Sequence, residues 1–199
     1  MRWVLEAALA GVGSFAATNI DDIFVLALFF GQVGEGGLRR QHVVIGQYLG
    51  FSALTAISLL GYFARLIIPE TWIGLLGLMP IALGVRKALI SRPALRAERP
   101  AQRSIGAVAA VTFANGGDNI GIYMPLFASS NAGQLGVILA VFYALVAVWC
   151  IIGLYVGRHP LVVGLLNRYG NKLVPVVLIA LGIYILWDCG TLRMLSTFK

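Results

Sequence analysis

The sequence predicts an all-α integral membrane protein, with six transmembrane helices arranged as two inverted three-helix repeats. Three observations lead to this prediction: an excess of apolar residues, their grouping into long stretches, and polar motifs that occur twice. Of the 199 residues, 59% are hydrophobic and only 12% are charged, and the mean hydropathy is +0.88. Soluble domains are about 45–50% apolar and about 25% charged. The composition therefore excludes an ordinary water-soluble fold.

Six apolar stretches provide the predicted helices, because a helix needs about 20 residues to cross the hydrocarbon core. They are roughly Trp3–Phe30, Val43–Ala64, Trp72–Leu89, Ile105–Ala128, Leu135–Val156 and Leu173–Trp187. The polar segment SRPALRAERPAQR, which contains two prolines, divides the chain into two halves. We therefore predict a first three-helix repeat over residues 1–90, a basic cytoplasmic linker over residues 91–104 and a second three-helix repeat over residues 105–199.

The distribution of basic residues predicts the orientation in the membrane. Eleven of the 15 Lys and Arg residues fall in the loops after the first, third and fifth stretches. The positive-inside rule places these loops in the cytoplasm, so both termini are predicted to lie outside it. This topology accounts for the net charge of +7. Because no basic stripe with interleaved aromatic residues is present, we expect no nucleic-acid partner.

Two short motifs recur in the two halves. AATNIDDI at Ala16–Ile23 aligns with FANGGDNI at Phe113–Ile120 at an offset of 97, and IALGV at Ile81–Val85 aligns with IALGI at Ile179–Ile183 at an offset of 98. Each half contains an odd number of helices, so the second half must enter the membrane in the opposite orientation. Inverted repeats of this kind build secondary transporters, whose substrate site lies near the midplane where the repeats meet.

The first copy of the acidic motif places two carboxylates deep in the predicted membrane span. Asp21 and Asp22 have apolar residues before and after them. An unpaired carboxylate at that depth costs at least about 2.5–3.5 kcal/mol, and such residues normally face a water-filled path or a cation. On a continuous helix Asn19 shares a face with Asp22. Thr18 is either a further ligand or a hydroxyl bonded back to its own helix.

The second copy combines polar side chains with glycine. On a continuous helix Asn115 shares a face with Asp118 and Asn119. Gly116 and Gly117 each disfavour the helix by about 1 kcal/mol relative to Ala, and they permit an unwound turn whose carbonyls face a cation. The alternative for the glycines is close packing of two helices, and the alternative for the asparagines is hydrogen bonding between helices.

Together the two motifs predict a metal site built from oxygen ligands. Three carboxylates and three side-chain amides would surround the cation: Asp21, Asp22, Asp118, Asn19, Asn115 and Asn119. About six to eight oxygen ligands suit a large divalent cation. Cadmium is softer than calcium but close to it in size, so such a site accepts cadmium without selecting it. The secondary candidates are Thr18, Gln47, Gly116 and Gly117; for Gln47, an interfacial pair with a tyrosine is the alternative.

No catalytic motif accompanies this site. HExxH, GxSxG and P-loop patterns are absent from the sequence, so we predict neither an enzyme nor a permanent cofactor, and any pumping must draw on an ion gradient or a partner. Cys150 and Cys189 lack the spacing of a zinc or redox motif. We interpret them as buried small side chains, with a soft metal ligand as the alternative.

Two longer stretches resemble the signature segments of a known family. FAATNIDDIFVLALFF (Phe15–Phe30) and VTFANGGDNIGIYMPLFA (Val111–Ala128) are similar to those of the bacterial cadmium resistance transporter family, and GQYLGF (Gly46–Phe51) also fits it. The family belongs to the lysine exporter superfamily of small six-helix carriers. The resemblance extends over essentially the whole chain, and it implies efflux of cadmium across the bacterial inner membrane. The motif positions that it carries over are Asn19, Asp21, Asp22, Asn115, Asp118 and Asn119.

The sequence thus predicts a secondary transporter in the bacterial inner membrane that exports divalent cations, cadmium above all, as its substrate. The lipid bilayer is its other expected partner, and the oligomeric state, a homo-oligomer included, is left open. The main alternative is an exporter of cationic amino acids or organic amines, in which the carboxylates would hold an ammonium group. A more remote alternative is an accessory membrane subunit or an intramembrane metalloenzyme.

Overall fold

The computed structural model describes residues 2–34, 38–64, 67, 69–89, 104–156, 175–189 and 191. The linker predicted at residues 91–104 lies outside the described residues except for Ser104, whose hydroxyl accepts a hydrogen bond from the backbone N–H of Ala107 at the start of the next helix. Many of the loop charges that predict the orientation also lie outside the described residues. The linker and the orientation therefore stay predictions.

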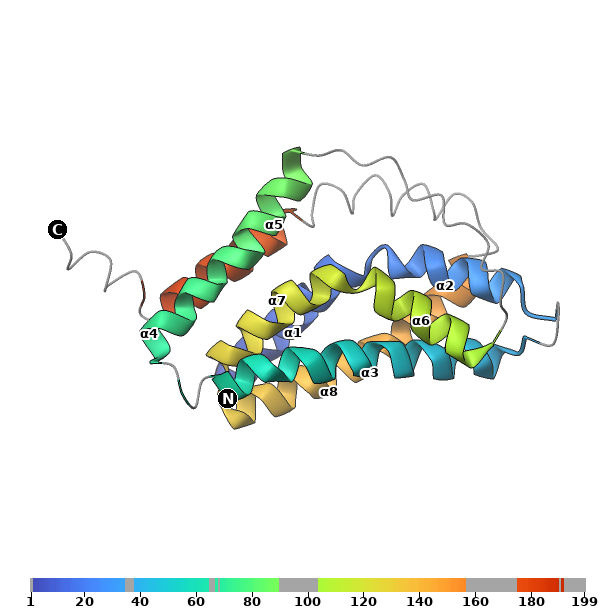
Figure 1. The fold of residues 1–199 in the computed structure, drawn as a ribbon, viewed down its shortest axis with the longest axis horizontal. Coiled ribbons are helices and arrows are strands. Elements are labelled where there is room, and N and C mark those ends of the chain that lie inside the picture. Colours follow the sequence, from blue (N-terminus) through green and yellow to red (C-terminus); the bar gives the residue numbers. More distant parts are fainter. Residues whose placement is uncertain are drawn as a thin grey trace.

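All regular structure in the described residues is helical (Figure 1). The first half contains α1 (Arg2–Asn19), α2 (Asp22–Gly31), α3 (Arg40–Ala64), α4 (Glu70–Ile73), the 3-10 helix η1 (Gly74–Gly77) and α5 (Leu78–Leu89). The second half contains α6 (Ile105–Asn115), α7 (Gly117–Ser129), α8 (Ala132–Val156) and a last helix at Pro175–Asp188, called the C-terminal helix below. The prediction of an all-helical fold is confirmed.

Two helices are long and apolar enough to cross a membrane by themselves. α3 and α8 each have 25 residues, which corresponds to about 37 Å of helix, more than the thickness of the hydrocarbon core. α1 and α2 meet the same criterion as a pair, with a bend of 61° between them. The described part of the chain therefore contains two clear spans, or three if the bent pair is one span. The count of six stays a prediction.

Large apolar side chains are exposed on the outer surface of these helices. Leu9 of α1 is 62% exposed, Leu60 of α3 61% and Ile151 of α8 55%. Water-soluble monomers rarely expose large contiguous apolar patches, whereas lipid chains are as apolar as leucine. The exposed leucine and isoleucine side chains thus agree with a protein whose helices face lipid.

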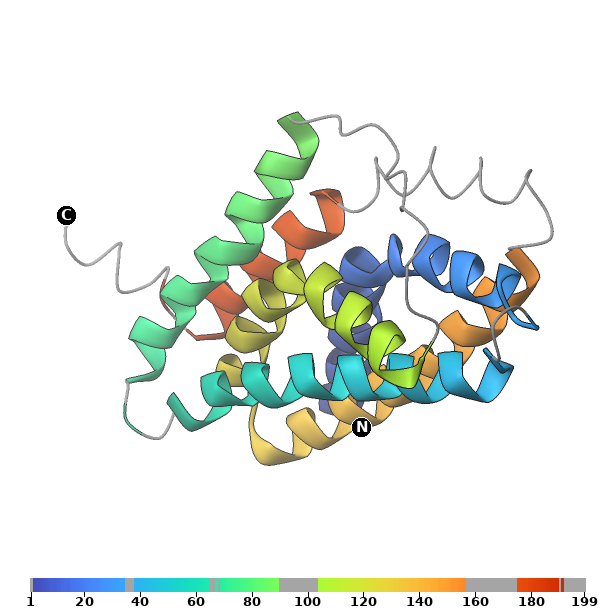
Figure 2. The ribbon, with the colours of Figure 1, turned by 45° about the vertical axis from the view of Figure 1, so that its right-hand side comes forward.

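The two long helices pack against helices of the opposite half (Figures 1 and 2). α3 lies along α6 and α7, and α8 lies along α1 and α2. Glycines allow the first contact, because a Cβ atom at Gly46 would lie 2.5 Å from Val108 and one at Gly50 would lie 2.6 Å from the carbonyl oxygen of Ala109. A long helix of one half therefore supports the pair of short helices of the other half.

The two repeated IALG segments lie at a second helix contact, where η1 and α5 run beside the C-terminal helix (Figures 1 and 2). A Cβ atom at Gly84 would lie 2.9 Å from the carbonyl oxygen of Pro175, and one at Gly77 would lie 2.7 Å from that of Gly182. Gly84 and Gly182 are the glycines of the two IALG segments. Close helix packing therefore explains why this glycine recurs.

An aromatic cluster fills the centre of the bundle. Its members come from α1, α3, α7 and α8, and each is at most 1% exposed: Phe15, Phe51, Tyr123, Phe127 and Phe142. The rings of Tyr123 and Phe142 are 4.4 Å apart between centroids, and those of Phe15 and Phe51 are 5.4 Å apart. Because α1 and α7 also carry the acidic motifs, this cluster fixes the helices that position the candidate site.

Candidate functional site

Two helix breaks fall inside the repeated acidic motif. α1 ends at Asn19 and α2 begins at Asp22, whereas α6 ends at Asn115 and α7 begins at Gly117. The glycines of the second motif predict the second break. The first break contains neither glycine nor proline, and sequence reasoning treats this stretch as one helix. The structure corrects that interpretation, since α1 and α2 are separate helices bent by 61°.

Gly116 is required for space and not for an unusual backbone conformation. Its φ of −85° is negative, as for other residues, but a Cβ atom there would collide with the side chain of Leu54 on α3. Gly117 has no atom within 4 Å of its Cβ position. Gly116 therefore both interrupts the helix and permits close packing. The unwound turn predicted for the two glycines is limited to Gly116.

Asp22 is the buried carboxylate of the site, with a side chain only 3% exposed. Asn115 Nδ2 donates to Asp22 Oδ1 at 2.5 Å, and Gln47 Nε2 donates to Asp22 Oδ2 at 3.3 Å. Gln47 is itself held by Thr112, whose hydroxyl donates to Gln47 Oε1 at 2.6 Å. Asp22 also lies in the first turn of α2, where the helix dipole favours a negative charge. Three helices therefore meet at this carboxylate.

Asn19 organises a second, uncharged cluster. Its Nδ2 donates to the hydroxyl of Tyr123 at 2.6 Å, and its Oδ1 accepts from Nδ2 of Asn119 at 3.1 Å. The hydroxyl groups of Thr18 and Tyr123 lie 2.8 Å apart. The indole N–H of Trp149 donates to the backbone carbonyl of Asn19 at 2.6 Å. This last bond satisfies a carbonyl at the end of α1, where the helix break removes the usual partner.

The other two acidic residues are less deeply buried. Asp21 and Asp118 are both half-buried, and their charges both act on Asp22. Asp118 lies in the first turn of α7, as Asp22 does in α2. Among the described residues, however, no three Asp, Glu, His or Cys side chains lie close enough to hold a metal ion together. A cation site that contains all three carboxylates stays a prediction.

The structure brings most of the predicted site residues into contact. Asn19 meets Asn119, and Asp22 meets Asn115 and Gln47. The interfacial Gln–Tyr pair considered for Gln47 does not form, since its side chain contacts Asp22 and Thr112. The hydroxyl of Thr18 donates back to its own helix, at 3.0 Å from the carbonyl oxygen of Ser14.

Three residues of the site are missed by sequence reasoning: Thr112, Tyr123 and Trp149. Helical spacing offered a signal for two of them, because Thr112 lies one turn before Asn115 and Tyr123 lies one turn after Asn119. Trp149 comes from α8, far away in the sequence, and no local pattern indicates its contact. Cys150 and Cys189 are both buried.

The exposed apolar helices and the polar cluster at two helix breaks define a class, an all-helical membrane protein with a buried polar site. The chain belongs to the cadmium resistance transporter family, whose family model matches residues 15–198. That match covers nearly the whole chain and confirms the resemblance of the two motifs. No curated protein and no solved structure matches the chain. The family is one of transporters.

Proposed function

We propose that the protein is a secondary transporter that exports divalent metal cations, cadmium foremost, across the bacterial inner membrane. The observation that carries the proposal is the position of Asp22, a buried carboxylate at the first helix break that is held by side chains from α3 and α6. Carboxylates are poor structural links between membrane helices and typically mark an ion path. Membership of a cadmium resistance family supports cadmium as the substrate.

The amide side chains around Asp22 can act either as hydrogen-bond donors to the carboxylate or as ligands of a cation. In the structure Asn115 and Gln47 direct N–H groups at the carboxylate. A rotation of each amide would direct its oxygen to the same place, so the groups that stabilise the bare carboxylate become ligands of a bound cation. Asp21 and Asp118 would then approach the bound cation and supply the remaining negative charge that neutralises it. This exchange lets the site hold a cation without leaving a buried charge uncompensated when the cation departs.

The packing of the long helices supports alternating access. α3 holds α6 and α7, and α8 holds α1 and α2, so each half supports the broken helix of the other. We propose that these halves are inverted repeats, with both termini outside the cytoplasm, and that rocking of one half against the other opens the site to each side in turn.

Export would be coupled to a proton gradient. Asp21 and Asp22 are adjacent, and two ionised carboxylates repel each other, so one of them is suited to carry a proton when no cation is bound. Cadmium transport in liposomes should therefore accelerate when a pH gradient is imposed. Equal rates with and without the gradient would contradict this coupling while leaving the cation site itself intact.

Transport by purified protein in liposomes tests the proposal, with cadmium, zinc and manganese measured separately. Wild-type protein should transport cadmium, and at cadmium concentrations well below half-saturation Asp22→Asn should reduce the initial rate about 100-fold, because the loss of about 3 kcal/mol of cation binding weakens the affinity by about that factor. Asp118→Asn examines the second motif in the same way, and a wild-type rate would remove Asp118 from the site. If wild-type protein transports no metal but transports lysine, the amine-exporter alternative replaces the proposal.

A further inference from the structure

The helices of the bundle form two groups that mix the halves of the sequence (Figures 1 and 2). α3 packs extensively on α6 and α7, and α8 packs extensively on α1 and α2, whereas the contact between these two groups is less extensive. We call the first group the α3 unit and the second group the α8 unit. Each unit combines the long helix of one half with the broken helix of the other half.

Close packing through glycine occurs inside the units. A Cβ atom at Gly61 of α3 would collide with the backbone carbonyl of Met124 on α7, and one at Gly153 of α8 would lie 2.6 Å from the Cβ atom of Leu26 on α2. Among the described glycines, the atom nearest to the Cβ position never belongs to the other unit. Helices that pack this closely resist sliding, because interiors tolerate little overlap. Each unit is therefore expected to move as one body.

The contact between the units is made by side chains, and the hydrogen bonds of the candidate site cross it. Asp22 of the α8 unit accepts from Asn115 and Gln47 of the α3 unit, and Asn19 of the α8 unit accepts from Asn119 of the α3 unit. Side-chain hydrogen bonds can be remade by rotation of the amides, whereas a glycine contact between two backbones has no such freedom. The contact between the units is therefore the one that a bound cation can change most easily.

A tyrosine cluster joins the two units along α3 and α8, away from the helix breaks. The hydroxyl of Tyr48 donates to the backbone carbonyl of Tyr143 at 3.0 Å, and the hydroxyls of Ser52 and Tyr143 lie 3.0 Å apart. The rings of Tyr48 and Tyr143 stack with 6.2 Å between their centroids. The long helices thus have their own connection, which can hold the units together while the contacts at the breaks change.

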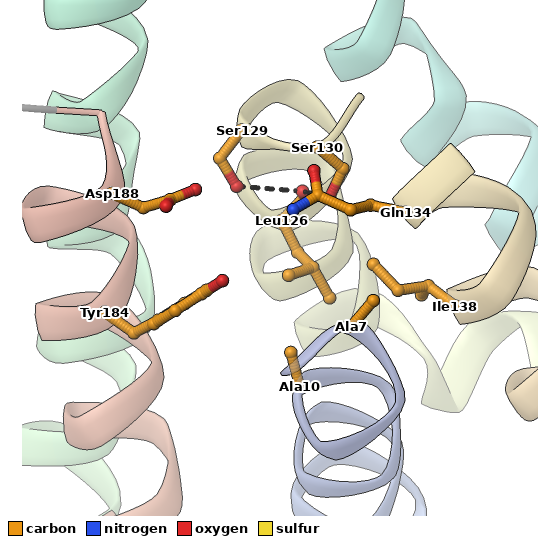
Figure 3. Close-up of a pocket in the computed structure, with 9 residues that line it drawn as sticks. All are labelled: Ala7, Ala10, Leu126, Ser129, Ser130, Gln134, Ile138, Tyr184 and Asp188. Atoms are coloured by element: carbon orange, nitrogen blue, oxygen red, sulfur yellow. Dashed lines mark hydrogen bonds between the residues drawn. The ribbon is translucent and has the colours of Figure 1, made fainter. Parts of the chain in front are cut away.

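The contact between the units leaves a small cavity at the end of the bundle where α1 begins and α7 ends (Figure 3). Ala7 and Ala10 of α1 line it together with Leu126 of α7. The hydroxyls of Ser129 and Ser130 donate to the backbone carbonyl of Leu126, at 2.9 and 2.7 Å, and these bonds stay within the α3 unit. Small side chains on α1 and hydrogen bonds internal to the α3 unit give little resistance to relative movement at this end.

We propose that transport moves the α3 unit against the α8 unit, so that the moving bodies are two mixed groups of helices and not the two halves of the sequence. The rocking proposed above then takes place between these units. The inference rests on the proposed function for its cargo, whereas the grouping of the helices does not depend on which cargo is carried. A cation held by Asp22, Asn115 and Gln47 would join the units, because its ligands come from both.

Distances between pairs of nitroxide spin labels distinguish the two groupings. The full-length protein, in a Cys150→Ala/Cys189→Ala background, is labelled at two exposed positions and measured in liposomes with and without cadmium. Leu9→Cys with Leu60→Cys joins one half but different units, so this distance should shift when cadmium is added. Leu9→Cys with Ile151→Cys joins different halves but one unit, so this distance should stay the same.

A reversible disulfide tests the same grouping during transport. Gly11 of α1 and Val141 of α8 lie in different halves but in one unit, and a Cβ atom at Gly11 would lie 3.5 Å from the Cβ atom of Val141. This distance is within the range of about 3.5–4.5 Å that a disulfide needs. Oxidised Gly11→Cys/Val141→Cys should transport cadmium within about twofold of the background rate, because a bond inside a rigid body does not restrict its rotation. Thiol labelling measures how much of the disulfide has formed.

Three results would overturn the two units. They are a cadmium-dependent shift of the Leu9–Ile151 distance, a loss of transport on oxidation that reduction restores, and an unchanged Leu9–Leu60 distance in a protein that transports cadmium. If wild-type protein transports lysine and no cadmium, the proposed function fails. Lysine then replaces cadmium in both measurements, and a shift confined to the Leu9–Leu60 distance still supports the two units.

Discussion

The two helix breaks occupy the same register of the repeated motif but differ in chemistry. At the first break the chain bends by 61° without glycine, and the buried Asp22 receives hydrogen bonds from two amides. At the second break Gly116 makes room for Leu54. The residue that aligns with Asp22 at the offset of 97 is the neutral Asn119, which donates to Asn19.

This difference shows that the repeat preserves the helix break and one carboxylate, since Asp21 aligns with Asp118, but not the buried carboxylate at the position of Asp22. Both breaks start a new helix with a carboxylate in its first turn, Asp22 in α2 and Asp118 in α7. The first break surrounds Asp22 with amide donors from other helices, and the second supplies the neutral Asn119 to Asn19 of the first. We therefore propose that the two halves have separate tasks, and three experiments can test this division.

The largest effect is expected from moving the buried charge from one break to the other. Asn119→Asp should destabilise the protein by about 3–5 kcal/mol, because the new carboxylate would face Asn19 Oδ1 without a donor. The double variant Asp22→Asn/Asn119→Asp should remain inactive in cadmium transport and should unfold at a lower temperature than Asp22→Asn. Transport restored by the double variant would mean that the two breaks are equivalent, contrary to the division of tasks.

A smaller effect is expected from removing one donor at the first break. Gln47→Leu deprives Asp22 of a hydrogen bond and leaves the hydroxyl of Thr112 without its acceptor. Hydrogen bonds to charged groups contribute about 1.5–3 kcal/mol. Because the Gln47 amide is also a proposed cation ligand, the half-saturating cadmium concentration should rise by about tenfold or more. Gln41→Leu, on the exposed start of the same helix, is the matched control and should behave as wild type. Identical kinetics for the two variants would remove Gln47 from the site.

The smallest effect is expected from the glycines of the second break. Gly116→Ala should destabilise the protein by about 1–3 kcal/mol, because the added methyl group overlaps Leu54. Gly117→Ala, in open space, is the control and should leave the melting temperature unchanged or slightly raised. Leu54→Ala should partly rescue Gly116→Ala. If both glycine variants melt at the same temperature, the close contact does not explain Gly116.

Sequence reasoning predicted the all-helical class because hydrophobic length is a local property, whereas the count of six spans stays a prediction. It also predicted the break at Gly116 and the joining of Asp22, Asn115, Asn19 and Asn119 in one region. It missed the break after Asn19, since nothing in that stretch breaks a helix by itself. The break is supported from a distance, by Trp149 on α8, which bonds to the freed carbonyl of Asn19.

The contacts around Asp22 could be predicted only in part for the same reason. The partners of a buried side chain depend on which helices are neighbours, and local patterns do not contain that information. Sequence reasoning therefore leaves two alternative roles for Gln47 and gives no reason to single out Thr112. Both become understandable once α3 is known to lie along α6, because Gly46 and Gly50 bring the two backbones close together beside Gln47.

The packing of α3 and α8 against helices of the other half has a consequence for the origin of the chain. A single three-helix half would leave the glycine face of α3 uncovered, since its partners α6 and α7 belong to the other half. Two copies inserted in opposite directions would cover each other, which makes an antiparallel dimer of a small ancestral protein a workable starting point. Fusion of the two copies replaces an encounter in the membrane by a fixed, high effective concentration. If the halves are inverted repeats as proposed, the fused copies would be free to diverge, one keeping the buried carboxylate and the other the neutral groups that face it.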